Sequence, residues 1–261
     1  MLKKLGWSVI LVLLWLITGA DLFLNGFKLT TVLTSKDSRI EFSGYQWTVK
    51  QNPFRFGAVG PFFFNSTKNV WVDRLGRLHL KIVKIKGVWY GSEVICKQSF
   101  GYGKYSFHLT APVGQLDPNV VLGLFTWSEN PFQASREIDI EFSKWGRGLD
   151  YNNAQYVIQP WTHSGNRRRF QVSPNLTSST HCFIWEKKRI SFQSLFCDPS
   201  RSGTSPRECP RQVLQEWKCR SRDIPAPGDE KVHLNLFLAA NRPPSDGREV
   251  EIMINEFQFT P

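Results

Sequence analysis

Three acidic residues alternate with apolar ones in a short stretch near the middle of the chain. The segment from Arg136 to Phe142 reads REIDIEF, and the side-chain period of a β-strand places Glu137, Asp139 and Glu141 on one face. Like charges along one strand face repel each other, so a purely structural strand gains nothing from this row. A glycosidase does need such a set, because a retaining enzyme uses one carboxylate as nucleophile and one carboxylic acid as proton donor, about 5 to 5.5 Å apart.

The spacing of the two glutamates fits this chemistry if their long side chains lean toward each other. Along an extended strand the Cα atoms of Glu137 and Glu141 are about 13 Å apart. The shorter Asp139 leaves room between them and adds negative charge, which raises the proton affinity of a neighbouring acid, as a general acid near neutral pH requires. The alternative is a half-exposed strand whose acids are simply solvated.

The composition favours one large β domain with a substantial core. The chain has 261 residues, including ten Trp and twenty Phe, and sugar-binding proteins use such rings because pyranose faces stack on them. The net charge of +11 fits an anionic partner, such as a charged polysaccharide, or is background charge. We expect no nucleic acid as partner, because no nucleic-acid motif accompanies the basic run from Arg167 to Arg169, which is more simply a solvated loop.

The N-terminal segment predicts export. Two lysines precede an apolar run from Leu5 to Gly19, so residues 1–20 have the pattern of a signal peptide cleaved near Ala20. A signal anchor is the alternative, although Asp21 interrupts the apolar run before it reaches the length of a membrane span. The mature domain is then residues 21–261, secreted or at the cell surface, with a membrane as partner only if the segment is not cleaved.

The cysteines suit an oxidising compartment, but their odd number leaves at least one unpaired within the chain. Three of them flank a polar insert at residues 198–218, so we expect a disulfide across it, with the pairing open. The histidines are scattered and there is no C-x-x-C motif, so the sequence supports no zinc site. The five cysteines are Cys96, Cys182, Cys197, Cys209 and Cys219.

Short strands and turns recur along the whole chain, and we find no amphipathic helix of ten residues or more. Residues 69–86 predict a hairpin, and only Leu214–Trp217 lies near a short helical turn. The pattern predicts an all-β fold, an antiparallel β-sandwich of the jelly-roll kind, forming a single domain. The other expected strands cover residues 30–51 (one or two strands), 92–98, 103–110, 120–127, 153–161, 169–172, 181–185, 189–197, 215–219, 232–239 and 249–259.

From Ser92 to Pro261 the order of several motifs resembles glycoside hydrolase family 16, a family of concanavalin A-like jelly rolls. The E-x-D-x-E spacing is similar to the lichenase-like branch. The resemblance implies that Glu137 is the nucleophile, Glu141 the acid/base and Asp139 an assisting residue in retaining hydrolysis. It leaves room for a structural calcium, implies no required cofactor, and fits a monomer. The matching motifs are Gly91-Ser92-Glu93, Ser99 to Tyr105, Phe125-Thr126-Trp127, His181 to Trp185, Val232 to Leu238 and Val250 to Phe259.

The chain departs from the branch at positions that would contact sugar. Ile95, Ser135, Val157 and Phe237 stand where the branch has Arg, Trp, Asn and Trp, so analogy with the family says little about the substrate. Strand periodicity places Gln155, Gln159 and Trp161 together on one face, opposite Tyr156 and Ile158, where amides and a ring suit a sugar. An exposed polar sheet face explains these residues equally well. The other substrate-binding candidates are Glu93, Trp127, His181 and Trp185, and burial in the core is the alternative for His181 and both tryptophans.

Three functions follow from these features. The first is an exported retaining endo-glycosidase that hydrolyses a β-linked polysaccharide of β-glucan or galactan type. The second is a transglycosylase that uses the same nucleophile with a sugar as acceptor. The third is a carbohydrate-binding surface protein without turnover. The row of acids argues against the third function, and the altered sugar-contact positions argue for it.

Overall fold

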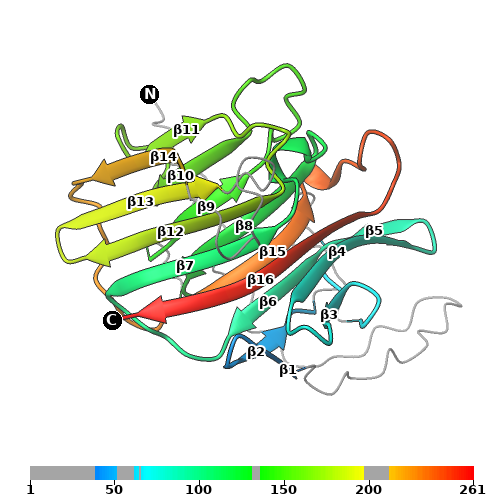
Figure 1. The fold of residues 1–261 in the computed structure, drawn as a ribbon, viewed down its shortest axis with the longest axis horizontal. Helices are drawn as coiled ribbons and strands as arrows, with labels where there is room; N and C mark the ends of the chain where they lie inside the picture. Colours follow the sequence, from blue (N-terminus) through cyan, green and yellow to red (C-terminus); the bar gives the residue numbers. More distant parts are fainter. Residues whose placement is uncertain (1–38, 52–61, 65, 131–135, 197–211) are drawn as a thin grey trace, which may run out of the picture. The chain divides into compact units, whose positions relative to one another are not determined.

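The computed structural model describes residues 39–51, 62–64, 66–130, 136–196 and 212–261. These residues form two antiparallel β-sheets (Figure 1). The first sheet has eight strands, in the spatial order β1 (Arg39–Phe42), β2 (Tyr45–Val49), β6 (Ser92–Cys96), β15 (Lys231–Leu238), β8 (Val120–Trp127), β9 (Ile138–Phe142), β10 (Ala154–Ile158) and β11 (Arg167–Phe170).

The second sheet also has eight strands. Strand β5 (Val88–Tyr90) lies off its main path and pairs with β4. The order of the other strands is β14 (Gln212–Cys219), β13 (Arg189–Phe196), β12 (Ser178–Glu186), β7 (Gly103–Thr110), β16 (Val250–Thr260), β4 (Leu78–Ile85) and β3 (Val70–Val72).

The hydrophobic core lies between the two sheets, because alternate residues of each strand face the opposite sheet. Ring contacts join the two layers. Tyr156 of β10 stacks on Phe192 of β13 with ring centroids 4.8 Å apart, and Trp47 of β2 meets the edge of Phe257 of β16 at 5.7 Å. The side chains on the other surface of the first sheet point away from the core. We call this surface the outer face of the first sheet.

The predicted all-β sandwich is confirmed, including the hairpin formed by β3 and β4. The helical segments found among the described residues are the short 3-10 turns η1 (Val113–Gln115) and η3 (Ala239–Asn241). The helical turn expected near Leu214–Trp217 is wrong, since these residues belong to β14. No helix in the described part of the chain combines the length and the apolar character that crossing a membrane requires.

The cysteine prediction is corrected in part. Cys96, Cys182 and Cys219 are buried free thiols, and Cys219 donates from Sγ to the carbonyl of Gly165 at 3.6 Å. Cys219 therefore takes no part in the disulfide that we expected across the insert at residues 198–218. Cys197 and Cys209 lie outside the described residues, as does the N-terminal segment 1–20.

Candidate active site

The three acidic residues of the central stretch share the outer face of the first sheet. Ile138, Ile140 and Phe142 of β9 are 0% exposed and point into the core, so the alternate residues Asp139 and Glu141 point outward. Glu137, directly before the strand, continues this face. We call these three acids the carboxylate row. Strand β9 lies between β8 and β10, so neighbouring strands supply side chains on both sides of the row.

Burial raises the pKa of every member of the carboxylate row, and repulsion between carboxylates raises the pKa of Glu137 and Asp139 further. Burial, and then the charge of Glu141, raises the pKa of Glu137 to about 7. Burial and the charges of both glutamates raise the pKa of Asp139 well above its usual value. The hydrogen bond between Asp139 and Glu137 lowers the pKa of Glu137 and raises that of Asp139. Asp139 is therefore the protonated partner and the hydrogen-bond donor, and the Glu137 carboxylate is the acceptor.

Glu141 has a different set of neighbours. Burial raises its pKa, while a hydrogen bond from Gln155 and the charge of Arg167 oppose that rise. The amide of Gln155 donates to Oε2 of Glu141 at 2.6 Å. A carboxyl group whose pKa is raised by burial holds its proton more tightly than a free one, which suits a general acid, and the amide of Gln155 fixes its orientation.

Gln155 of β10 and Gln159, directly after this strand, lie where strand periodicity predicts them. Gln155 is in register with Glu141. Gln159 donates from its amide nitrogen to Oδ2 of Asp139 at 3.5 Å, and its amide oxygen accepts a hydrogen bond from the backbone N–H of Trp161 at 2.9 Å. Trp161 is 51% exposed, so Gln159 joins an open aromatic ring to the middle of the carboxylate row.

On the other side of the row, β8 and β15 supply a glycine and an asparagine that the sequence did not indicate as site residues. Gly123 of β8 is in register with both Glu141 and Asn235. A Cβ atom at Gly123 would lie 2.6 Å from Oδ1 of Asn235, so the Asn235 side chain extends over the glycine toward Glu141. This Oδ1 is buried without a hydrogen-bond partner among the described residues, which makes Asn235 a candidate to bind a substrate hydroxyl.

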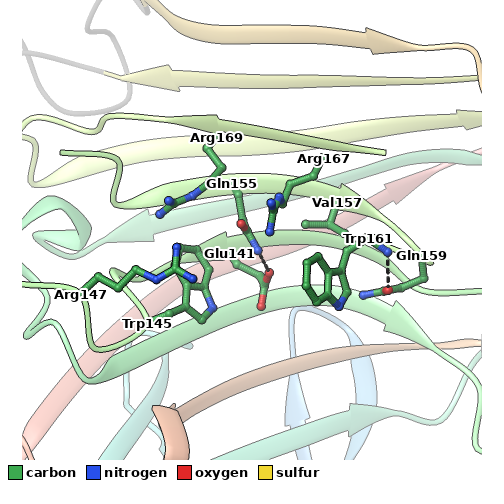
Figure 2. A pocket seen from close by; sticks show the side chains of 9 residues that line it. All are labelled: Glu141, Trp145, Arg147, Gln155, Val157, Gln159, Trp161, Arg167 and Arg169. Atoms are coloured by element: carbon green, nitrogen blue, oxygen red, sulfur yellow. Dashed lines mark hydrogen bonds between the residues drawn. The ribbon is translucent and has the colours of Figure 1, made fainter. Parts of the chain in front are cut away.

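A cavity of about 390 Å³ opens beside Glu141. Figure 2 shows Trp145 on one side of Glu141 and Trp161 on the other, with three arginines around them. A cavity of this size, with aromatic rings and a few convergent polar groups, suits a sugar residue. We call it the Glu141 cavity. Its lining residues are Glu141, Trp145, Arg147, Gln155, Val157, Gln159, Trp161, Arg167 and Arg169.

The basic run from Arg167 to Arg169 is not the solvated loop that we expected. It forms β11 and pairs with β10, with Arg167 opposite Val157 and Arg169 opposite Gln155. Both alternate arginines therefore face the Glu141 cavity, whereas Arg168 lies opposite the core residue Tyr156 and so on the other face of the sheet. The alternation of the run is visible in the sequence, but its pairing partner is not.

Two of the predicted substrate-binding residues are part of the core instead. His181 of β12 is 0% exposed, and its ring nitrogens hydrogen-bond Ser194 at 2.7 Å and Ser179 at 2.8 Å. Burial lowers the pKa of His181 to about 3. Trp185, on the same strand, is 1% exposed and donates from Nε1 to the carbonyl of Pro225. The packing of the second sheet against the first encloses both residues.

Glu93 and Trp127 lie at the opposite end of the site from the Glu141 cavity. Glu93 is only 2% exposed, and it accepts hydrogen bonds from His233 at 2.8 Å and Lys50 at 2.9 Å. Burial alone would raise the pKa of Glu93, but His233 and Lys50 together lower it. Glu93 is therefore a buried ionic anchor and not an open contact for substrate.

Trp127 stays partly exposed. Phe125 of its strand is in register with Asp139, so two residues further on Trp127 lies beside Glu137 on the outer face. The Lys50 ammonium lies 5.7 Å from the centre of its ring. This position is compatible with stacking on a sugar, which stays a prediction.

Among the described residues, no group of three or more His, Cys, Asp or Glu side chains is arranged to hold a metal ion. The described residues therefore contain no such side-chain cluster for the structural calcium that the resemblance left open.

The fold is that of solved glucanase structures. No protein-family model matches the chain, and a search of curated proteins found no match. A β-glucanase of Bacillus licheniformis superposes with a TM-score of 0.59 at 18% identity, over 82% of this chain and 92% of that chain. A glycoside hydrolase family 16 endo-glucanase from Bacteroides ovatus gives a TM-score of 0.58 at 13% identity, over 82% and 94%.

A pseudo β-1,3-glucanase of Mycobacterium tuberculosis is also similar, with a TM-score of 0.56 at 15% identity, over 80% of this chain and 88% of that chain. These superpositions establish the fold. Because the sequence identities are low, the activity has to be argued from the residues of the site. The chain therefore has the antiparallel jelly-roll fold of these β-glucanases, with the carboxylate row on the outer face of its first sheet.

Proposed function

We propose that the protein is a retaining endo-glycosidase that cleaves a β-linked polysaccharide of the β-glucan type. The observation that carries this proposal is the carboxylate row, three acids with raised pKa values on the outer face of a central strand. A binding protein has no use for three carboxyls that repel each other, whereas acid/base chemistry requires their shifted pKa values. The glucanase fold of the solved neighbours adds support.

The neighbours of each acid suggest its role. Glu137 receives a hydrogen bond from protonated Asp139, which stabilises its carboxylate as the nucleophile that attacks the anomeric carbon and forms the glycosyl-enzyme. Glu141 in its acid form gives its proton to the leaving glycosidic oxygen. In the second step Glu141 takes a proton from water, and the water oxygen displaces Glu137 from the sugar.

The experiment that tests this proposal compares the variants Glu137→Gln and Glu141→Gln with the parent protein. Release of reducing ends is measured on lichenan, laminarin, xyloglucan, agarose and carrageenan. We expect the parent to hydrolyse at least one of these and each variant to lose at least a thousandfold in kcat, because each substitution removes a group that acts in the transition state. Undiminished hydrolysis by either variant contradicts the proposal.

A carbohydrate-binding protein without turnover is the second candidate. Ile95 and Phe237 stand where the lichenase-like branch, which the sequence resembles, has Arg and Trp. One solved neighbour with this fold is described as a pseudo β-1,3-glucanase. Binding to a glucan with no release of reducing ends by the parent protein would favour this candidate. A transglycosylase is distinguished by products longer than the substrate when an oligosaccharide acceptor is added.

A further inference from the structure

The Glu141 cavity contains more positive charge than a neutral sugar requires. Arg147, Arg167 and Arg169 all line it. Hydroxyl groups of a neutral sugar are bound by amides and carboxylates, which Gln155, Gln159 and Glu141 already supply. A guanidinium group instead matches a planar or tetrahedral anion, because its N–H groups reach two oxygens at once.

One of the three arginines has both terminal guanidinium nitrogens bound within the protein. Arg169 forms an ion pair with Asp150 at 2.5 Å and donates to the carbonyl of Asn152 at 2.9 Å. Its guanidinium also lies 5.1 Å from the centre of the Trp145 ring. Arg169 therefore holds one aromatic wall of the cavity in place, and its charge is balanced by Asp150.

The other two arginines are available. Arg167 and Arg147 are exposed, and no carboxylate of the described residues forms an ion pair with either. The Arg167 guanidinium lies 5.0 Å from the centre of the Trp161 ring. This contact holds it in place, and within the described ranges its N–H groups have no hydrogen-bond acceptor. Figure 2 shows this guanidinium pointing toward the cavity between Gln155 and Trp161.

The position of these charges beside Glu141 adds a second argument. The charge of Arg167 lowers the pKa of Glu141, which works against a group that must hold a proton at the start of the reaction. An anion bound to Arg167 would neutralise this effect and return the proton affinity to Glu141. An unneutralised arginine beside a general acid is therefore explained best by a substrate that brings its own negative charge.

We propose that the Glu141 cavity binds a sugar residue bearing a carboxylate or sulfate group, with Arg147 and Arg167 contacting the anion and Trp145 and Trp161 flanking the ring. This inference rests on the proposed function only for the identity of the polysaccharide to which the sugar belongs. Both anions present oxygen acceptors to the same guanidinium groups, so the experiment has to separate them.

The test measures binding without turnover, in the Glu137→Gln background. Three probes share one β-glucan oligosaccharide: unmodified, oxidised at primary hydroxyls to carboxylates, and sulfated. Calorimetric titration should show that one anionic probe binds at least about tenfold more tightly than the unmodified one, the scale of one charge-assisted hydrogen bond to an anion. The preferred anionic probe identifies the anion as carboxylate or sulfate.

Matched variants separate this site from the general positive charge of the protein. Arg147→Ala combined with Arg167→Ala should remove the preference for the anionic probe. Arg168→Ala removes one positive charge from the strand that carries Arg167, but from its opposite face, so it should change binding less than twofold. Thermal melting of each variant checks that the fold is intact, which is expected because all three side chains are exposed.

The outcomes of this experiment and of the hydrolysis assay are independent. Equal affinity of the Glu137→Gln protein for all three probes, or a preference that survives the added double substitution, overturns the inference. Hydrolysis of unmodified glucan together with equal affinity keeps the proposed function and rejects the anionic site. Selective binding through Arg147 and Arg167 with no hydrolysis of any probe keeps the anionic site and rejects the proposed function.

Discussion

Replacing Glu137 by Gln removes one charge from the carboxylate row and almost preserves the shape of the side chain. Folding raises the pKa of Glu137 from 4.5 to about 7, so the native state keeps this proton while the unfolded chain loses it between these two values. The stability that depends on the proton is complete below pH 4.5 and is lost as the pH rises to about 7. A glutamine has no such proton to lose.

The size of the effect follows from the two pKa values. A rise from 4.5 to about 7 corresponds to about 3 kcal/mol of native-state destabilisation at alkaline pH. This value is an upper limit for the destabilisation, because Glu137 interacts with Asp139 and Glu141 and the three acids share the negative charge of the row. We therefore expect Glu137→Gln to stabilise the protein by about 1 to 3 kcal/mol at about pH 8, and by little at about pH 4.

Equilibrium unfolding in urea at both pH values measures this difference directly. The matched control is Glu41→Gln, which removes an exposed carboxylate from β1, the edge strand of the same sheet. The control should change the free energy of unfolding by less than about 0.5 kcal/mol at either pH. Equal stabilisation by Glu137→Gln at both pH values, or destabilisation at about pH 8, would refute the claim that repulsion and burial strain the row.

Three further predictions concern its surroundings. Gln155→Met removes the amide donor of Glu141, so the pKa of Glu141 rises and the alkaline limb of the kcat/KM profile moves to higher pH; an unmoved limb contradicts the assignment of Glu141 as acid. Gly123→Ala places a Cβ atom 2.6 Å from Oδ1 of Asn235, so kcat/KM should fall about tenfold or more with little change in Tm; unchanged kcat/KM would exclude Asn235 as a substrate contact. His181→Ala should lower the free energy of unfolding by about 2 to 4 kcal/mol and leave kcat of the folded protein unchanged; a loss of kcat without loss of stability would return His181 to the active site.

Strand periodicity was sufficient to predict the facing of residues on a single element. The apolar partners Ile138 and Ile140 are buried as expected. Gln155 on the neighbouring strand and Gln159 just beyond its end contact the carboxylate row. These predictions succeed because successive side chains of a strand alternate between its two faces, whatever the rest of the fold does.

Positions that depend on pairing between distant strands could not be predicted in this way. Alternation puts His181 and Trp185 on one face of β12, but only the stacking of two sheets decides that this face is the core. The arginines of β11 reach the cavity because Arg167 pairs with Val157, and the sequence does not specify that register. The burial of Glu93 was missed for the same reason, since His233 of β15 and Lys50, directly after β2, cover it.

The most direct test of the catalytic claim is to trap the covalent intermediate. A β-glucoside oligosaccharide with an activated leaving group, and with fluorine in place of the hydroxyl next to the anomeric carbon, forms the glycosyl-enzyme and hydrolyses slowly. Mass spectrometry of the digested protein should locate the sugar on Glu137. A label on Glu141 or Asp139, or turnover of the natural glycan with inversion at the anomeric carbon, would contradict the account.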